Sequence, residues 1–219
     1  MKSDKKRTTF LKLLPILICA VFLILVLTSG EELTVQTVLD YTPKSPAAAA
    51  LVILLLYALK SVSVVFPIAV LQIATGHLFP TPAALLINFL GRAITLSIPY
   101  GIGRFSGSGM AESLREKHPR LDELCSRHGQ NPLFISFLLR TFCFLPGDAV
   151  SLYLGAIKIP FPCYLAGGSL GTALGVILST ILGSSISTPG SPAFLLSASL
   201  MVLAAVISAL FYIHGRRKP

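Results

Sequence analysis

Long apolar runs, separated by short polar or basic segments, form the main pattern along this chain. A helix that spans a bilayer needs about 20 consecutive, mostly apolar residues. Four runs have about this length, at 11–29, 83–103, 162–185 and 193–213, and two broken apolar stretches lie at 47–79 and 133–157. Only 12% of the residues are charged and the mean hydropathy is +0.78, whereas about a quarter of a soluble domain is charged. The pattern predicts an all-α integral membrane protein.

The two halves of this pattern repeat each other. The segment that begins FPIAVLQIATGH is followed, 79 residues later, by the similar segment LPGDAVSLYLGA. The alignment pairs prolines and glycines of the two halves: Pro67 with Pro146, Gly76 with Gly155 and, after one inserted residue, Gly91 with Gly171. Each half therefore contains an apolar arm, a proline break, a second apolar arm, a proline exit and a helix rich in small residues.

The two proline-broken stretches are predicted to be re-entrant hairpins, at 47–80 and 131–160. Pro67 and Pro80 lie 13 residues apart, which corresponds to about 20 Å of helix, whereas the hydrocarbon core is about 30 Å thick. Hairpins that enter and leave on one side suit such short arms, and their irregular backbone must be buried in protein or line a polar cavity. The residues expected to form the breaks and hinges are Pro67, Gly76, Pro146, Gly147 and Gly155.

The grouping of the basic residues predicts the topology. Of the 18 Lys and Arg, five lie before residue 13, five between 104 and 127, and three at 216–218. Cytoplasmic loops of membrane proteins carry such an excess of basic residues. With both termini cytoplasmic and both hairpins re-entrant, every loop obeys this rule and the two repeats are inverted in the membrane, as in many transporters. The same grouping explains the net charge of +9 without nucleic-acid binding.

The expected organisation has three parts. Residues 1–46 contain a cytoplasmic tail, a first transmembrane helix and an outer loop. Residues 47–186 form the core, with the two hairpins and transmembrane helices at 83–103 and 162–185. Residues 193–219 form a last transmembrane helix and a basic cytoplasmic tail. A cleaved signal peptide is the alternative for the N-terminal apolar run, but the run is long for one and no A-x-A site follows it.

Four charged residues are expected in the membrane zone, namely Lys60, Arg92, Arg140 and Asp148. A charge at the bilayer centre costs at least about 2.5–3.5 kcal/mol on insertion scales, and such residues mark substrate or ion pathways. The four together carry a net charge of +2, which suits an anion, and arginine offers a bidentate fork for phosphate. Structural roles are the alternative to substrate binding. In this interpretation, Asp148 caps the returning half-helix. Arg140 then forms a salt bridge with Asp148, or it caps carbonyl groups left free at the proline break.

Glycines at helical spacing predict close helix packing. Gly167, Gly171 and Gly175 are four residues apart and share one helix face, and Gly91 begins a weaker version in the first repeat. Small residues at this spacing allow the backbones of membrane helices to approach closely. The four Cys and four His show no spacing typical of a metal site or a disulfide, so no metal and no other cofactor is expected.

A longer motif lies around the second proline break. The run F-x-x-R-x-x-x-x-x-P-G-D-x-V-S-x-x-x-G-A, from Phe137 to Ala156, resembles the signature of the DedA / VTT-domain (SNARE-associated Golgi protein) superfamily. The resemblance extends over residues 62–183. It implies paired re-entrant hairpins, cytoplasmic termini and lipid translocation or scrambling, and it assigns the functional motif to Arg140 and Asp148. In bacteria the lipids it implies are undecaprenyl phosphate or phosphatidylethanolamine.

The first hairpin departs from that family pattern, because many relatives carry an acid in this hairpin, whereas this chain has Lys60 and Gln72 there. We expect a translocase or scramblase for anionic or phosphate-bearing membrane lipids, located in a bacterial inner membrane. An ion-coupled small-solute transporter of inverted-repeat design, driven by protons or sodium, is the alternative, and a homo-oligomer remains open. An enzyme is not expected, because the chain shows no acid pair, no His-rich cluster and no nucleophile–base arrangement.

Overall fold

The structure is a computed structural model of the 219-residue chain, and it describes residues 35, 45–61, 67–106, 109, 112, 116, 131–141 and 147–216. At 205 and 208–216 the description covers the backbone only. The predicted first transmembrane helix at 11–29 lies outside the described residues. So do the predicted hairpin tips at 62–66 and 142–146, and with them Pro146.

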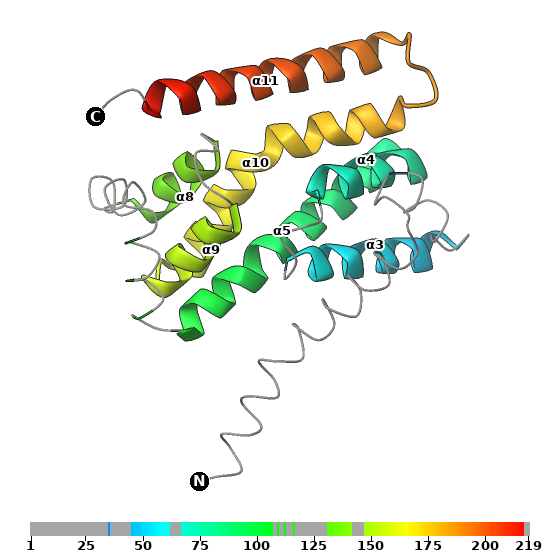
Figure 1. The fold of residues 1–219 in the computed structure, drawn as a ribbon. Helices are drawn as coiled ribbons and strands as arrows, with labels where there is room; N and C mark the ends of the chain where they lie inside the picture. Colours follow the sequence, from blue (N-terminus) through cyan, green and yellow to red (C-terminus); the bar gives the residue numbers. More distant parts are fainter. Residues whose placement is uncertain are drawn as a thin grey trace, which may run out of the picture.

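The described residues form α-helices and contain no strand (Figure 1). In chain order the helices are α3 (Pro46–Lys60), α4 (Ile68–Leu78), α5 (Thr81–Ser106), α8 (Pro132–Thr141), α9 (Gly147–Ala156), α10 (Phe161–Ser184) and α11 (Pro192–Arg216). The predicted all-α fold class is therefore confirmed.

Two of these helices, α5 and α10, are long and apolar enough to cross a membrane. They contain 26 and 24 residues, or roughly 36–39 Å of helix, against a hydrocarbon core of 30 Å. Exposed leucines such as Leu86 on α5 and Leu174 on α10 give them an apolar outer surface that suits lipid. The structure therefore places a helix of sufficient length and apolar content at each of the predicted spans, 83–103 and 162–185. The last predicted span corresponds to α11, which packs against α10 (Figure 1).

The other four helices are short, and prolines separate them from their neighbours. α3 has 15 residues, α4 has 11, and α8 and α9 have 10 each, which is about 15–23 Å of helix. Pro67 precedes α4 in an extended conformation, with φ −69° and ψ 121°. Pro80 lies between α4 and α5, and Pro160 lies between α9 and α10. Each pair of short helices therefore consists of arms that are individually shorter than the roughly 30 Å hydrocarbon core.

The short helices pack on the two long helices in a reciprocal way. The first arm of each hairpin packs on the long helix that follows it, α3 on α5 and α8 on α10. The second arm crosses over, so that α4 packs on α10 and α9 packs on α5. Figure 1 accordingly shows α3 and α4 at one end of the α5–α10 pair and α8 and α9 at the other end.

Glycines allow both crossed contacts to form between backbones. A Cβ atom at Gly76 in α4 would lie 2.2 Å from the carbonyl oxygen of Thr180, and one at Gly155 in α9 would lie 2.1 Å from that of Tyr100. Thr180 follows Tyr100 by 80 residues, so the two contacts join equivalent positions of the repeat. The hinge role predicted for Gly76 and Gly155 is wrong, because both residues are buried inside helices.

The glycines predicted to pack helices have different surroundings. A Cβ atom at Gly167 or Gly171 in α10 would lie 2.2 or 2.7 Å from a backbone oxygen of α8. One at Gly91 in α5 would lie 2.2 Å from the ring of Tyr57. One at Gly175 would meet nothing within 4 Å. The packing role predicted for Gly175 is therefore wrong, because no described residue packs against its face of α10.

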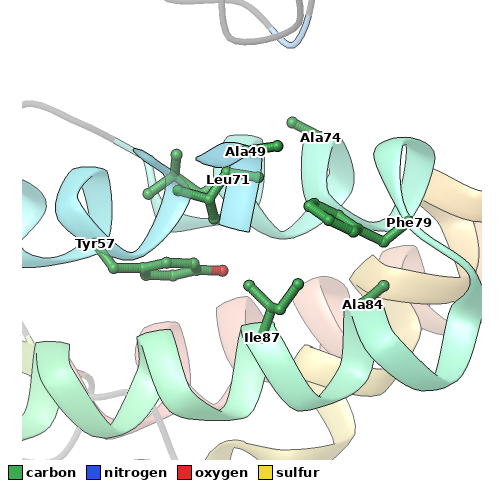
Figure 2. Close-up of a cluster of buried hydrophobic side chains, with 8 residues drawn as sticks. Ala49, Tyr57, Leu71, Ala74, Phe79, Ala84 and Ile87 are labelled. Carbon is green, nitrogen blue, oxygen red and sulfur yellow. The ribbon is translucent and has the colours of Figure 1, made fainter. Parts of the chain in front are cut away.

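Two apolar clusters fill the spaces between the helices. The first joins α3, α4 and α5, and Figure 2 shows Tyr57 extending from α3 toward Ile87 of α5, with Phe79 nearby. The second joins α5, α8, α9 and α10 and includes Leu96 and Val150. Each hairpin thus shares a core with the long helices.

Lys158 ends α9 in a left-handed conformation. Its φ is 61°, a region in which glycine is usual at a helix C-terminus. The amide of Lys158 donates to the carbonyl of Gly155 at 3.0 Å, and the amide of Ile159 donates to that of Leu154 at 3.1 Å. This is the hydrogen-bond pattern of a Schellman motif, and it turns the chain from α9 toward α10.

Candidate functional site

An ion pair links the two hairpins. Lys60 is the last residue of α3 and Asp148 lies in the first turn of α9. The Nζ atom of Lys60 lies 3.1 Å from Oδ2 of Asp148, and their side chains are 13% and 31% exposed. A salt bridge between Asp148 and Arg140 was one of the alternatives expected from the sequence, but the carboxylate pairs with Lys60, 88 residues away. Asp148 is also not an N-cap, because it lies inside α9, which begins at Gly147.

Arg140 lies near this pair in a network of hydroxyl groups. It is the penultimate residue of α8 and is only 6% exposed. Its Nη2 atom donates to Oγ of Ser151 in α9 and, at 3.2 Å, to the hydroxyl of Tyr164 in α10. Tyr164 donates in turn to the carbonyl of Leu96 in α5 at 2.9 Å. Four helices therefore meet at one buried guanidinium group.

Tyr164 is itself held rigidly by aromatic neighbours. Its ring stacks on Tyr100 of α5, with the ring centroids 4.6 Å apart and the planes at 23°. The hydroxyl of Tyr100 donates to the carbonyl of Ile159 at 2.5 Å and accepts from Nη1 of Arg104 at 3.0 Å. Since a stacked and hydrogen-bonded ring has few alternative rotamers, Tyr164 presents its hydroxyl to Arg140 at a defined position.

Arg92 completes the group of charges. Its Nε atom donates to Oγ1 of Thr172 at 3.2 Å. These two residues lie 80 positions apart, so α5 and α10 contact each other there through equivalent positions of the repeat. Thr172 follows Gly171, at which an added Cβ atom would lie 2.8 Å from Cβ of Arg140, so Arg92 and Arg140 contact neighbouring residues of α10. The four charged residues predicted from the sequence therefore lie in one region of the fold.

The sequence analysis did not identify Ser151, Tyr164 and Thr172 as parts of this site. Ser151 follows Asp148 by three residues in α9, a spacing that places both on one face of a helix, so this residue was open to prediction. Tyr164 and Thr172 come from α10, and only the packing of α10 on α5 and α8 brings them to the arginines.

The first hairpin contains an uncharged network at the corresponding place. The hydroxyl of Tyr57 donates to Oδ1 of Asn88 at 2.8 Å. The amide nitrogen of Asn88 donates to the carbonyl of Gln72 at 3.1 Å and to Oγ1 of Thr180 at 2.8 Å. All four residues are buried and Asn88 uses both its oxygen and its nitrogen. We interpret this network as structural, because it fastens α3 and α4 to the long helices and includes no charge.

Metal-binding groups do not gather in the described residues. No set of three or more His, Cys, Asp or Glu side chains that could hold a metal ion occurs there. The expectation that the protein uses no metal or other cofactor remains a prediction.

The fold and the site together define a helical membrane protein with a charged group between two broken helical arms. The model of the VTT domain matches residues 66–185 of the chain, which is more than half of its 219 residues. The chain therefore belongs to the VTT domain family, the DedA/VTT family suggested by the motif around Arg140. Comparisons with curated proteins and with solved structures give no match.

Proposed function

We propose that this protein is a lipid translocase or scramblase that moves anionic or phosphate-bearing lipids between the two leaflets. The observation that carries the proposal is that three cations, Lys60, Arg92 and Arg140, lie in one region of the core of a membrane protein together with a single acid, Asp148, which pairs with Lys60. With a net charge of +2 the group offers a favourable place for a phosphate. A purely structural network has no need of a charge excess that is expensive in a membrane.

We further propose that the two halves form an inverted repeat and that each hairpin is re-entrant. The reciprocal packing of α4 on α10 and of α9 on α5 supports this arrangement, because an inverted repeat exchanges these two contacts. The short arms support it as well, since about 15–23 Å of helix does not cross the hydrocarbon core. In this topology both termini are cytoplasmic, and we place the protein in a bacterial inner membrane.

The geometry suggests how a headgroup would be held. Arg140 is oriented by two hydroxyl groups, and hydroxyls stabilise a guanidinium by hydrogen bonds without cancelling its charge. Arg92 is oriented in the same way by Thr172. Two arginines oriented by neutral partners can attract a lipid phosphate while the acyl chains remain against the apolar outer surface of the helices.

Flipping of fluorescent lipids in proteoliposomes tests this function. Arg140→Gln keeps a polar side chain and removes the charge, and we expect it to reduce flipping of labelled phosphatidylglycerol at least about tenfold, the loss expected when a charged hydrogen-bonding partner is removed. Lys158→Gln is the matched control, because it removes an exposed positive charge at the α9–α10 turn. Equal flipping by wild type, Arg140→Gln and empty liposomes would contradict the proposal.

The same vesicles distinguish the alternative function. An ion-coupled transporter of small solutes would accumulate labelled inorganic phosphate inside the vesicles when a proton or sodium gradient is applied. A lipid translocase would flip phosphatidylglycerol and leave phosphate outside. Uptake of phosphate that depends on Arg140, with no lipid flipping, would favour the transporter.

A further inference from the structure

The Lys60–Asp148 ion pair has a special place in the architecture. In the described part of the chain, α3 and α4 pack on the long helices, and so do α8 and α9, but no helix of one hairpin packs closely on a helix of the other. The ion pair bridges this division, because Lys60 ends α3 and Asp148 begins α9. This salt bridge joins one hairpin to the other.

Each hairpin is also fastened to the long helices by a separate network. In the first hairpin, the hydroxyl of Tyr57 donates a hydrogen bond of 2.8 Å to Oδ1 of Asn88 in α5. In the second, Nη2 of Arg140 donates one of 3.2 Å to the hydroxyl of Tyr164 in α10. These two hydrogen bonds are made by side chains other than Lys60 and Asp148. Separation of the ion pair therefore leaves both hairpins folded and attached to α5 and α10.

The positions of the two charges in their helices reduce the free energy needed to separate them. Lys60 lies in the last turn of α3 and Asp148 in the first turn of α9. A cation at a helix C-terminus and an anion at a helix N-terminus are each stabilised by the helix dipole. Each group thus retains a favourable partner when the other leaves. Both side chains are also partly exposed, so another charged group can reach them.

We propose that this ion pair is a latch between the two hairpins, and that an anionic headgroup opens it by replacing Asp148 beside Lys60. This inference rests on the proposed lipid-moving function and adds to it a basis for headgroup selection. The phosphate of phosphatidylglycerol offers Lys60 the same negative charge as the carboxylate. Phosphatidylcholine carries the same phosphate but also a quaternary ammonium group, so its headgroup has no net charge and Lys60 repels the ammonium. The latch therefore favours lipids with a net negative headgroup.

The two ends of the latch then have different roles, which a purely structural ion pair does not. Asp148→Asn releases the latch and keeps the cation that receives the headgroup. Lys60→Met releases the latch and also removes that cation. A structural ion pair would instead lose the same interaction from either side, and the two variants would have similar effects.

The test measures flipping of labelled phosphatidylglycerol and phosphatidylcholine in proteoliposomes that contain the full chain. With Asp148→Asn we expect both lipids to be flipped faster than by the wild type, and phosphatidylcholine by about fivefold, the factor that corresponds to one partly exposed ion pair. With Lys60→Met we expect phosphatidylglycerol flipping to fall about fivefold, to the rate of phosphatidylcholine. Asp148→Glu keeps the carboxylate and should retain the wild-type preference. Thermal unfolding in detergent verifies that each variant is folded.

The outcomes separate the latch from the function on which it rests. If wild type flips lipid but Asp148→Asn and Lys60→Met slow phosphatidylglycerol to the same extent, the latch is wrong and the proposed function stands. The latch is equally wrong if neither variant changes the ratio of the two lipids. If wild type flips neither lipid, the proposed function fails, and the latch fails with it.

Discussion

Replacing Gly76 with alanine tests the crossed packing of the two halves. The new methyl group would lie 2.2 Å from the carbonyl oxygen of Thr180, and since non-bonded carbon and oxygen atoms stay more than 3 Å apart, α4 must move away from α10. Overpacking of this kind costs about 1–3 kcal/mol. Alanine recovers about 0.5–1 kcal/mol in a helix relative to glycine. The net loss of unfolding free energy should therefore lie between about 0 and 2.5 kcal/mol, with a middle value of about 1 kcal/mol.

Gly175→Ala is the matched control, because the same change is made on α10 at a position where the methyl group meets nothing within 4 Å. Its expected effect is a gain of up to about 1 kcal/mol from helix propensity alone. Reversible unfolding by denaturing detergent, followed by circular dichroism, measures the difference between the two variants. Gly155→Ala should behave like Gly76→Ala, since its methyl group would lie 2.1 Å from the carbonyl oxygen of Tyr100. If Gly76→Ala and Gly155→Ala proved as stable as Gly175→Ala, the reciprocal packing would be refuted.

Three further substitutions test individual parts of the fold and site. Tyr164→Phe keeps the stacked ring and removes the hydroxyl shared by Arg140 and Leu96. We expect a stability loss of about 1–3 kcal/mol and slower lipid flipping, and unchanged flipping would show that Arg140 does not need the Tyr164 hydroxyl to orient it. Asn88→Ala removes three hydrogen bonds and should lower the unfolding free energy by about 2–3 kcal/mol in the same assay. A decrease of less than half of that would mean that other contacts replace the network. Lys158→Gly relieves the left-handed conformation at the end of α9 and should raise stability by about 0.5–1 kcal/mol, so a lower melting temperature would contradict the Schellman motif.

The lengths of the apolar runs and the positions of the prolines were sufficient to place the two long helices α5 and α10. Length and apolar content determine whether a segment can cross a bilayer, and the predicted ends of α5 and α10 differ from the observed ends by three residues or fewer. Prolines mark breaks between helices because they cannot continue the hydrogen-bond ladder, and Pro67, Pro80 and Pro160 each lie next to a helix end. The charged residues of the site were likewise visible as exceptions in apolar segments.

The partners of those residues were decided by the tertiary structure alone. Arg140 was one of the partners expected for Asp148, whereas in the fold Asp148 pairs with Lys60, 88 residues away. Gly76 and Gly155 were interpreted as hinges, although they are contact points between helices. A repeat in the sequence shows which segments are equivalent, but it does not show that the second arm of each half crosses to the other half. That crossing depends on where the backbones of two helices can come into van der Waals contact. Such contact is a property of a pair of helices, so the sequence of one segment does not determine it.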